Sequence, residues 1–209
     1  QNRVSALSLI IAPHSRVQFP VYCIERSRWS YSDGFNFSGS RFSVGPSIRS
    51  KKAEMIKKEH YQYVQSAVWD EVSDMSKKFK TSSSTEDYVE ILNKQNFMGI
   101  KQINDFIINQ ETCGYVFSTP DYNLIEIFPN EMICRVKAIG MIQSLLADID
   151  YSRDEFITPN KDELYDKLMT SRWIKRKPIG LEERWELLGD KQGQLISKNG
   201  QIAHGFQFI

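Results

Sequence analysis

The chain has 209 residues, of which 41% are hydrophobic and 25% are charged, a composition typical of a globular protein that buries its own core. The formal net charge of +1 excludes a global electrostatic attraction to nucleic acid or to a membrane surface. No apolar run approaches the roughly 20 residues that cross a bilayer, so we expect no membrane partner. Three cysteines without short spacing, and no visible targeting signal, lead us to expect reduced thiols and a cytoplasmic location.

The first 25 residues predict two antiparallel strands. Residues 4–12 alternate and then become apolar, residues 13–15 have turn composition, and residues 17–25 alternate again. The second alternation separates two faces, with Val17, Phe19, Val21 and Cys23 on one and Tyr22 and Ile24 on the other. We take the first face as the apolar one and therefore expect Cys23 to be a buried, unreactive thiol.

Residues 26–46 predict a long loop rich in aromatic side chains. Serines and glycines recur through it and are interleaved with Trp29, Tyr31, Phe35, Phe37 and Phe42. A loop of this length inside a compact domain is usually functional or disordered, and its aromatic content argues against disorder.

The middle of the chain is predicted to be helical. Pro46 and Ser47 begin a basic helix that is expected to reach about His60, and a polar break follows a second, amphipathic helix. The apolar stripe of that second helix is Val64, Val68, Val72, Met75 and Phe79. Ser84 with Asp87 resembles a capping box, and further helices are expected near 100–107, over 131–148 and after Asn160.

The later part of the chain returns to β-structure. Residues 114–117 and 124–128 predict one hairpin, and residues 194–197 and 201–204 a second around Asn199-Gly200. The pattern predicts a single α+β domain over residues 1–209, with an N-terminal antiparallel sheet, a helical middle and a C-terminal β-hairpin returning to the sheet. The chain opens at Gln1 without a methionine, so we expect its natural start to be missing.

Several short motifs carry a family resemblance. They are Gln1-Asn2-Arg3, Pro20-Val21-Tyr22-Cys23-Ile24-Glu25 and Arg28-Trp29, supported by Gln65, Val68 and Trp69, by 114–128, and by Gly200 and His204. Over nearly its whole length the chain resembles the first ADP-ribosylglycohydrolase-and-rhodanese-phosphatase-associated protein domain family, although Tyr22 stands where the family often has serine. The family's name records gene neighbourhoods with NAD- and ADP-ribose-related enzymes, so the resemblance implies a nucleotide-linked role. That the part missing before Gln1 is an N-terminal strand is implied only by the family that the chain resembles.

The polar end of the second strand is the predicted ligand site. Its candidate ligand-binding residues are Gln1, Asn2, Arg3, Glu25, Arg28 and Trp29. Arginine forks suit phosphate and aromatic faces suit bases, so we assign phosphate to Arg3 and Arg28, ribose to Glu25 and stacking to Trp29. The leading interpretation is a domain without a cofactor that binds a nucleotide-type anion, such as ADP-ribose or an NAD-derived metabolite.

Other interpretations stay open. The basic residues of the region 26–58 also suit single-stranded nucleic acid, or an ordinary solvated helix face; they are Arg26, Arg28, Arg41, Arg49, Lys51, Lys52, Lys57 and Lys58. A hydrolase of an ADP-ribosyl or phosphoester bond would use Glu25 as general base, and a protein-interaction scaffold would use the aromatic loop. Glu25 and Arg28 are equally consistent with a structural ion pair below a buried Trp29.

The sequence contains no motif typical of a metal site or of a standard phosphate-binding loop. The three histidines, His14, His60 and His204, lack ligand spacing, and there is no Cys-x-x-Cys, P-loop or Gly-x-Gly-x-x-Gly. A second basic cluster surrounds Trp173 and is either a wall of a groove or an ordinary exposed connection; it consists of Arg172, Lys175, Arg176 and Lys177.

Overall fold

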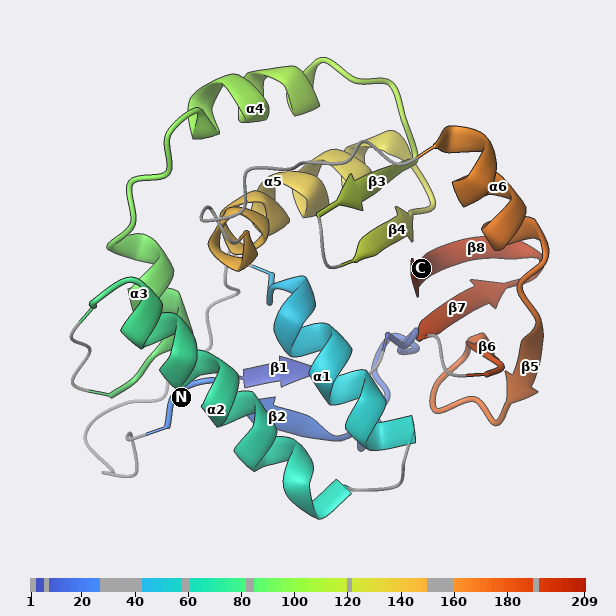
Figure 1. The fold of residues 1–209 in the computed structure, drawn as a ribbon. Coiled ribbons are helices and arrows are strands. Elements are labelled where there is room, and N and C mark those ends of the chain that lie inside the picture. Colours follow the sequence, from blue (N-terminus) through green and yellow to red (C-terminus); the bar gives the residue numbers. More distant parts are fainter. Residues whose placement is uncertain are drawn as a thin grey trace. The chain divides into compact units, whose positions relative to one another are not determined.

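The computed structural model describes residues 3–5, 8–26, 43–57, 61–81, 85–119, 122–149, 160–189 and 192–209 (Figure 1). The chain forms two compact units. Unit 1 consists of residues 1–6, 20–107 and 139–148, and unit 2 of residues 7–19, 108–138 and 149–209. Helix α5 (Glu131–Asp148) contributes residues to both. The prediction of a single domain over residues 1–209 stays a prediction.

Unit 1 combines a short β-ribbon with helices. Its elements are β1 (Arg3–Ser5), β2 (Val21–Cys23), α1 (Pro46–Lys57), α2 (Tyr61–Lys78), α3 (Tyr88–Asn93), most of α4 (Ile100–Ile108) and the second part of α5. β1 and β2 are antiparallel, with Arg3 opposite Cys23 and Ser5 opposite Val21. Helices α1 and α2 pack along each other, and α2 also packs on β2 (Figure 1).

The core of unit 1 follows the stripe predicted for α2. Val64, Val68 and Val72 are fully buried, so the predicted stripe is confirmed. Tyr22 and Ile24 join this core from the ribbon, whereas Cys23 is only half-buried. The expectation that Cys23 lies on the buried face is therefore wrong. Alternation shows which side chains share a face, but packing against the helices decides which face is covered.

Gln65 completes the open edge of β2. Its side-chain amide accepts a hydrogen bond from the N–H of Cys23 at 2.8 Å and donates one to the carbonyl oxygen of Cys23 at 2.8 Å. The amide thus takes the place of a neighbouring peptide group. Just after β2, the N–H of Tyr88 donates to the carbonyl oxygen of Ile24. Residues of α2 and α3 therefore satisfy backbone groups at the end of the ribbon.

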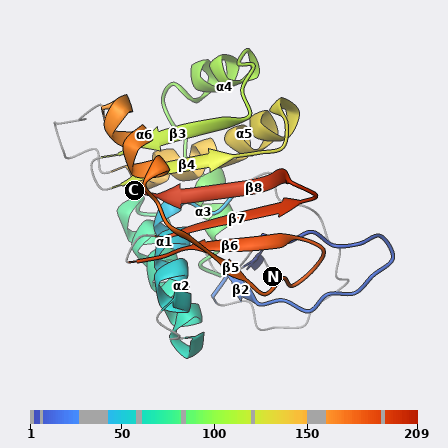
Figure 2. The same cartoon turned by 90° about the vertical axis from the view of Figure 1, so that its right-hand side faces the viewer.

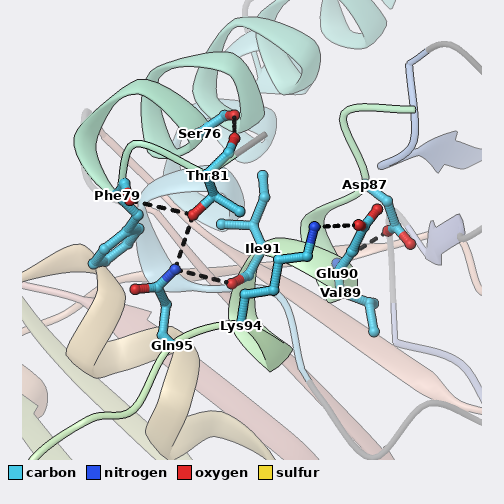
Figure 3. Close-up of polar contacts among 9 residues, drawn as sticks. All are labelled: Ser76, Phe79, Thr81, Asp87, Val89, Glu90, Ile91, Lys94 and Gln95. Carbon is cyan, nitrogen blue, oxygen red and sulfur yellow. Dashed lines mark hydrogen bonds and ion pairs between the residues drawn. The ribbon is translucent and has the colours of Figure 1, made fainter. Parts of the chain in front are cut away.

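Side chains also tie the residues that follow α2 to those that follow α3 (Figure 3). Gln95 donates to the hydroxyl of Thr81 at 2.9 Å, and the Ser76 hydroxyl donates to the carbonyl oxygen of Thr81 at 2.8 Å. Asp87 is the N-cap of α3 and accepts from the N–H of Val89 at 3.0 Å, whereas the predicted capping box places Asp87 at the third helical position. Its predicted partner Ser84 lies outside the described residues.

The start of α1 is held by the end of α5. The carboxylate of Asp148 accepts from the backbone N–H of Ser47 at 2.8 Å and from its hydroxyl at 2.9 Å. This supplies an acceptor and a negative charge to the helix N-terminus. A Cβ on Gly45 would lie 3.0 Å from both carboxylate oxygens, so the close approach suits glycine. The N–H of Gly45 in turn donates to the hydroxyl of the fully buried Tyr88.

Unit 2 contains a six-stranded antiparallel sheet in the order β3-β4-β8-β7-β6-β5 (Figure 2). Its elements are β3 (Gly114–Ser118), β4 (Asn123–Ile127), β5 (Trp173–Arg176), β6 (Glu183–Leu187), β7 (Gly193–Lys198), β8 (Gln201–Phe208) and α6 (Lys161–Met169). The predicted hairpin is β7–β8, with Asn199 and Gly200 at positive φ in its turn. It lies at the centre of this second sheet. The predicted α+β class is confirmed.

Two further findings concern the β5–β6 hairpin and the length and hydropathy of the helices. β5 and β6 pair as an antiparallel hairpin, for which the sequence analysis made no strand prediction. None of the described helices combines the length and the hydropathy that a membrane crossing requires.

The Gln65 contacts generate a prediction about stability. Gln65→Met keeps the side-chain length but leaves two backbone groups of Cys23 without partners, and we expect a loss of about 2–3 kcal/mol in the free energy of unfolding. Ser66→Ala is the matched control, because its hydroxyl makes only an exposed local contact with Tyr63. Urea unfolding of both variants measures the difference; equal stabilities would contradict the role assigned to Gln65.

Candidate functional site

The structure describes part of the site that the sequence predicts. Arg3 and Glu25 are among the described residues, whereas Gln1, Asn2, Arg28 and Trp29 lie outside them. Arg3 is exposed and faces Cys23 across the ribbon, and Glu25 follows Cys23 by two positions. These two predicted residues are therefore brought to the same end of the ribbon.

Glu25 is a buried acidic residue rather than a surface one. It is 2% exposed, its backbone forms a bridge with Asp87, and its carbonyl oxygen accepts a contact from the thiol of Cys23 at 3.0 Å. Burying a carboxylate is costly unless polar groups surround it. The end of β2 is thus a polar site within unit 1.

Lys52 is a second buried charge in unit 1, and the sequence analysis had counted it only as part of a basic region. It lies in α1, is 7% exposed, and its ammonium donates to the carbonyl oxygen of Ser5 on β1 at 2.6 Å. Burial, and then the positive charge of Arg49, lower its pKa from the ordinary value to about 7. Among the described residues, no carboxylate forms an ion pair with Lys52.

The second basic cluster is an ordinary exposed pair of strands. Lys175 pairs with Glu183 at 3.1 Å, and Arg176 pairs with Glu186 at 2.8 Å across the β5–β6 ladder. These positive charges are matched by acidic neighbours. Two of the four basic residues, Lys175 and Arg176, thus lie on a paired strand and face carboxylates, which argues against the wall of an anion-binding groove.

A polar chain in unit 2 escaped the sequence analysis. The Ser8 hydroxyl lies 2.8 Å from Nδ1 of His204, and Nε2 of His204 lies 3.3 Å from Oε1 of Glu126. The Tyr115 hydroxyl donates to Oε2 of the same carboxylate. His204, Glu126 and Tyr115 come from the neighbouring strands β8, β4 and β3, with Tyr115 directly opposite Glu126. We call these four residues the Ser8 chain.

Backbone contacts position the segment that carries Ser8. The N–H of Ser8 donates to the buried side chain of Gln194 at 3.0 Å, and the N–H of Ile10 donates to Glu182 at 3.0 Å. The carbonyl oxygen of Ile10 accepts from the N–H of Leu181 at 2.8 Å. Residues 8–12 were expected to continue the first strand, but their partners lie around the C-terminal strands instead.

Glu182 is the anchor of this contact. Burial by itself raises the pKa of its carboxyl group, but hydrogen bonds from the N–H groups of Ile10, Ile179 and Gly180 outweigh burial and lower that pKa overall. A Cβ on Gly180 would lie 2.1 Å from the carbonyl oxygen of Ile10, so only glycine permits this approach.

One sequence signal could have indicated the Ser8 chain. Glu126 stands between Ile125 and Ile127 within a strand, where a charged residue suits neither a core nor an edge. Its partner His204 is 78 positions away, and Ser8, the partner of His204, is 196 positions from that histidine, so neither is identifiable this way. In the described part of the chain, no group of three or more His, Cys, Asp or Glu residues is arranged to hold a metal ion.

Comparison with protein families gives one match. The ARG and Rhodanese-Phosphatase-superfamily-associated Protein domain, ARPP-1, matches residues 1–208. The chain belongs to the ARPP-1 family. Comparisons of this ARPP-1 domain with curated proteins and with solved structures find no match. The match covers both units of the structure, and it confirms the resemblance carried by the motifs near the amino terminus and around His204.

Glu182, which anchors the Ser8 segment of this ARPP-1 domain, gives a prediction about stability that depends on pH. Glu182→Gln keeps the shape of the side chain but replaces one acceptor oxygen by a donor, so we expect a loss of about 1–3 kcal/mol at pH 7. The lowered pKa means that ionised Glu182 stabilises the folded state above the unfolded carboxyl pKa of about 4 and loses this effect as pH falls.

The difference between wild type and Glu182→Gln should therefore shrink between pH 7 and pH 3. Glu183→Gln is the control, since it removes a partly exposed ion pair with Lys175 and should change stability by less than about 1 kcal/mol. Urea unfolding at both pH values measures the two differences. A Glu182→Gln effect that grows as the solution is acidified would contradict the prediction.

Proposed function

We propose that this ARPP-1 domain binds a nucleotide-type anion, such as ADP-ribose or an NAD-derived metabolite, at the β1–β2 ribbon of unit 1. The family description, which names association with ADP-ribosylglycohydrolase and rhodanese-phosphatase proteins, supports a nucleotide-linked role. We further propose a cytoplasmic location, because Cys23, Cys113 and Cys134 are all free thiols.

The observation that carries the proposal is the buried ammonium of Lys52. A lysine has three N–H donors, and among described residues only the carbonyl oxygen of Ser5 accepts from it. Its positive neighbour Arg49 further disfavours the charged form. A phosphate group at this position would supply both acceptors and the missing negative charge. The site is therefore better suited to the complex with an anion than to the free protein.

Glu25 suits the other end of such a ligand. Its carboxylate is buried near the exposed Arg3, at the end of the ribbon. A carboxylate accepts hydrogen bonds from two neighbouring hydroxyls, which a ribose offers, and an arginine pairs with phosphate oxygens in bidentate fashion. In the proposed complex Arg3 and Lys52 contact phosphate and Glu25 contacts ribose. The proposal retains Gln1 and Asn2 as hydrogen-bond donors, Arg28 on phosphate and Trp29 on the base.

Ligand-dependent thermal shift tests the proposal. We expect ADP-ribose or NAD to raise the Tm, since a ligand at about 100 times its Kd stabilises a protein by about 3 kcal/mol, and each kcal/mol corresponds to about 2–4 °C at this size. Lys52→Met should abolish the shift. Lys51→Ala, which removes the same charge from the exposed neighbouring position of α1, should preserve it.

Two further arms separate a nucleotide from a simple anion. Glu25→Gln should weaken the shift with ADP-ribose and leave any shift with inorganic phosphate unchanged, because only the former has a ribose. Each variant is compared with its own unliganded Tm, so a change in basal stability does not enter. The proposal fails if ADP-ribose, NAD and simple nucleotides all leave the Tm of the wild type unchanged, or if Lys52→Met retains the full shift.

The affinity should also depend on pH through Lys52. Its pKa of about 7 means that much of the free protein carries a neutral amine above pH 7, whereas a bound anion favours the ammonium. Binding then takes up a proton, and the affinity should fall by up to about tenfold per pH unit above about pH 7. Calorimetry at three pH values between 6.5 and 8.5 measures the slope. Lys51→Ala should show the same slope as the wild type, and a wild-type affinity that is unchanged between pH 6.5 and 8.5 would refute this assignment.

A further inference from the structure

We propose that Ser8, His204 and Glu126 of unit 2 form a nucleophile–base–acid triad that transfers the acyl group of an uncharged carboxylic ester. Ser8 lies 2.8 Å from one ring nitrogen of His204, and Glu126 lies 3.3 Å from the other. A nucleophile, a base within hydrogen-bond reach and a third group that orients the base are the signature of an activated serine. This inference concerns a different site and does not rest on the proposed function.

The hydrogen-bond directions agree with this assignment. An ionised carboxylate only accepts, so Glu126 accepts from the Tyr115 hydroxyl and from the N–H at Nε2 of His204. A neutral imidazole then has its lone pair at Nδ1, which faces the Ser8 hydroxyl. The proton of Ser8 is thus directed at the atom that would remove it. Glu126 fixes the ring and its tautomer, and Tyr115 positions Glu126.

Exposure is graded along the Ser8 chain in the order that catalysis requires. Ser8 is half-buried, the side chain of His204 is 20% exposed, and that of Glu126 is 3% exposed. A substrate can therefore approach the serine and the imidazole, while the carboxylate stays away from water. A buried carboxylate next to an imidazole strengthens their mutual attraction because the surroundings have a low dielectric constant.

A purely structural role does not explain why Ser8 faces His204. The segment is already held by the hydrogen bonds of Ser8 N–H to Gln194 and of Ile10 to Glu182 and Leu181. The contact between the Ser8 hydroxyl and His204 is additional to these. Burying Glu126 among apolar strand residues costs free energy, and sites with such a cost are disproportionately functional.

The surroundings of His204 indicate the class of substrate. The ring centroids of Phe128 and Phe206 lie 5.2 Å and 6.0 Å from the centroid of the His204 ring. These apolar neighbours favour an uncharged acyl group over a phosphate ester or a peptide with charged side chains. The apolar residues Leu9 and Ile10, which follow Ser8 in the chain, add to this character.

The proposed reaction needs no co-reactant other than water. Ser8 Oγ attacks the ester carbonyl carbon and its proton moves to Nδ1 of His204. The tetrahedral adduct collapses, the bond to the alkoxide breaks, and the alkoxide takes the proton from His204. Water then attacks the acyl-serine as His204 accepts its proton, and that proton returns to Ser8 Oγ when the carboxylic acid is released.

Covalent labelling of the full chain with a fluorophosphonate tests the triad without knowledge of the natural substrate. Such a probe loses fluoride when an activated serine attacks its phosphorus. We expect an intact-mass increase of one adduct, mapped by peptide sequencing to Ser8. Ser8→Ala should prevent labelling, and His204→Gln and Glu126→Gln should slow it at least about 100-fold. Ser15→Ala is the matched control, since that exposed serine bonds only to the carbonyl oxygen of Ala12 within its own turn.

Two further measurements on folded variants separate a catalytic role from a structural one. Tyr115→Phe should retain labelling of Ser8 at a reduced rate, because Tyr115 acts only through Glu126. Hydrolysis of 4-nitrophenyl acetate by wild type and by Ser8→Ala, both with native Tm, provides a second readout, and the expected result is loss in the variant. Two results would overturn the proposal: no adduct on Ser8 in folded wild type, or equal labelling rates in wild type and in a folded His204→Gln variant.

Discussion

Two backbone groups of Cys23 would face the helices unpaired if Gln65 did not reach them. β1 and β2 have only three residues each, and a two-stranded ribbon of this size is not stable by itself. The amide of Gln65 supplies both missing hydrogen bonds and ties β2 to α2. The register of this ribbon sets the positions of Arg3, of Glu25 and of the Ser5 carbonyl oxygen that Lys52 contacts.

Both units bury a charged side chain where an apolar one would be more stable. In unit 1 this is Lys52, whose ammonium has a single backbone acceptor in the described part of the chain, and in unit 2 it is Glu126 with its tyrosine and histidine partners. Each burial costs free energy that the surrounding packing must offset. Among the described residues, Lys52 has no partner of opposite charge, whereas Glu126 accepts from Tyr115 and contacts His204. The first suits capture of an anion, and the second suits a preorganised reaction site.

The two candidate sites also differ in how the chain builds them. The ribbon site draws on β1, on the end of β2 and on α1, and its described residues lie between positions 3 and 52. The Ser8 chain collects residues from the amino terminus, from β3 and β4 and from the last strand. Its geometry depends on the order of strands in the six-stranded sheet, which brings β8 beside β4.

The sequence by itself determined the features that depend on local periodicity and turn chemistry. The stripe of α2, the Asn199-Gly200 turn and the α+β class were all predictable, because they rest on side-chain spacing and backbone preference within a few residues. The start of α3 was not, since its N-cap is Asp87, three positions after the predicted one. Tertiary structure alone decided that Tyr22 rather than Cys23 enters the core, since alternation is symmetric until a partner covers one face. It also decided that Ser8 meets His204 across 196 positions of chain, because strand order and the contacts of Glu182 set that pairing and no local pattern encodes it.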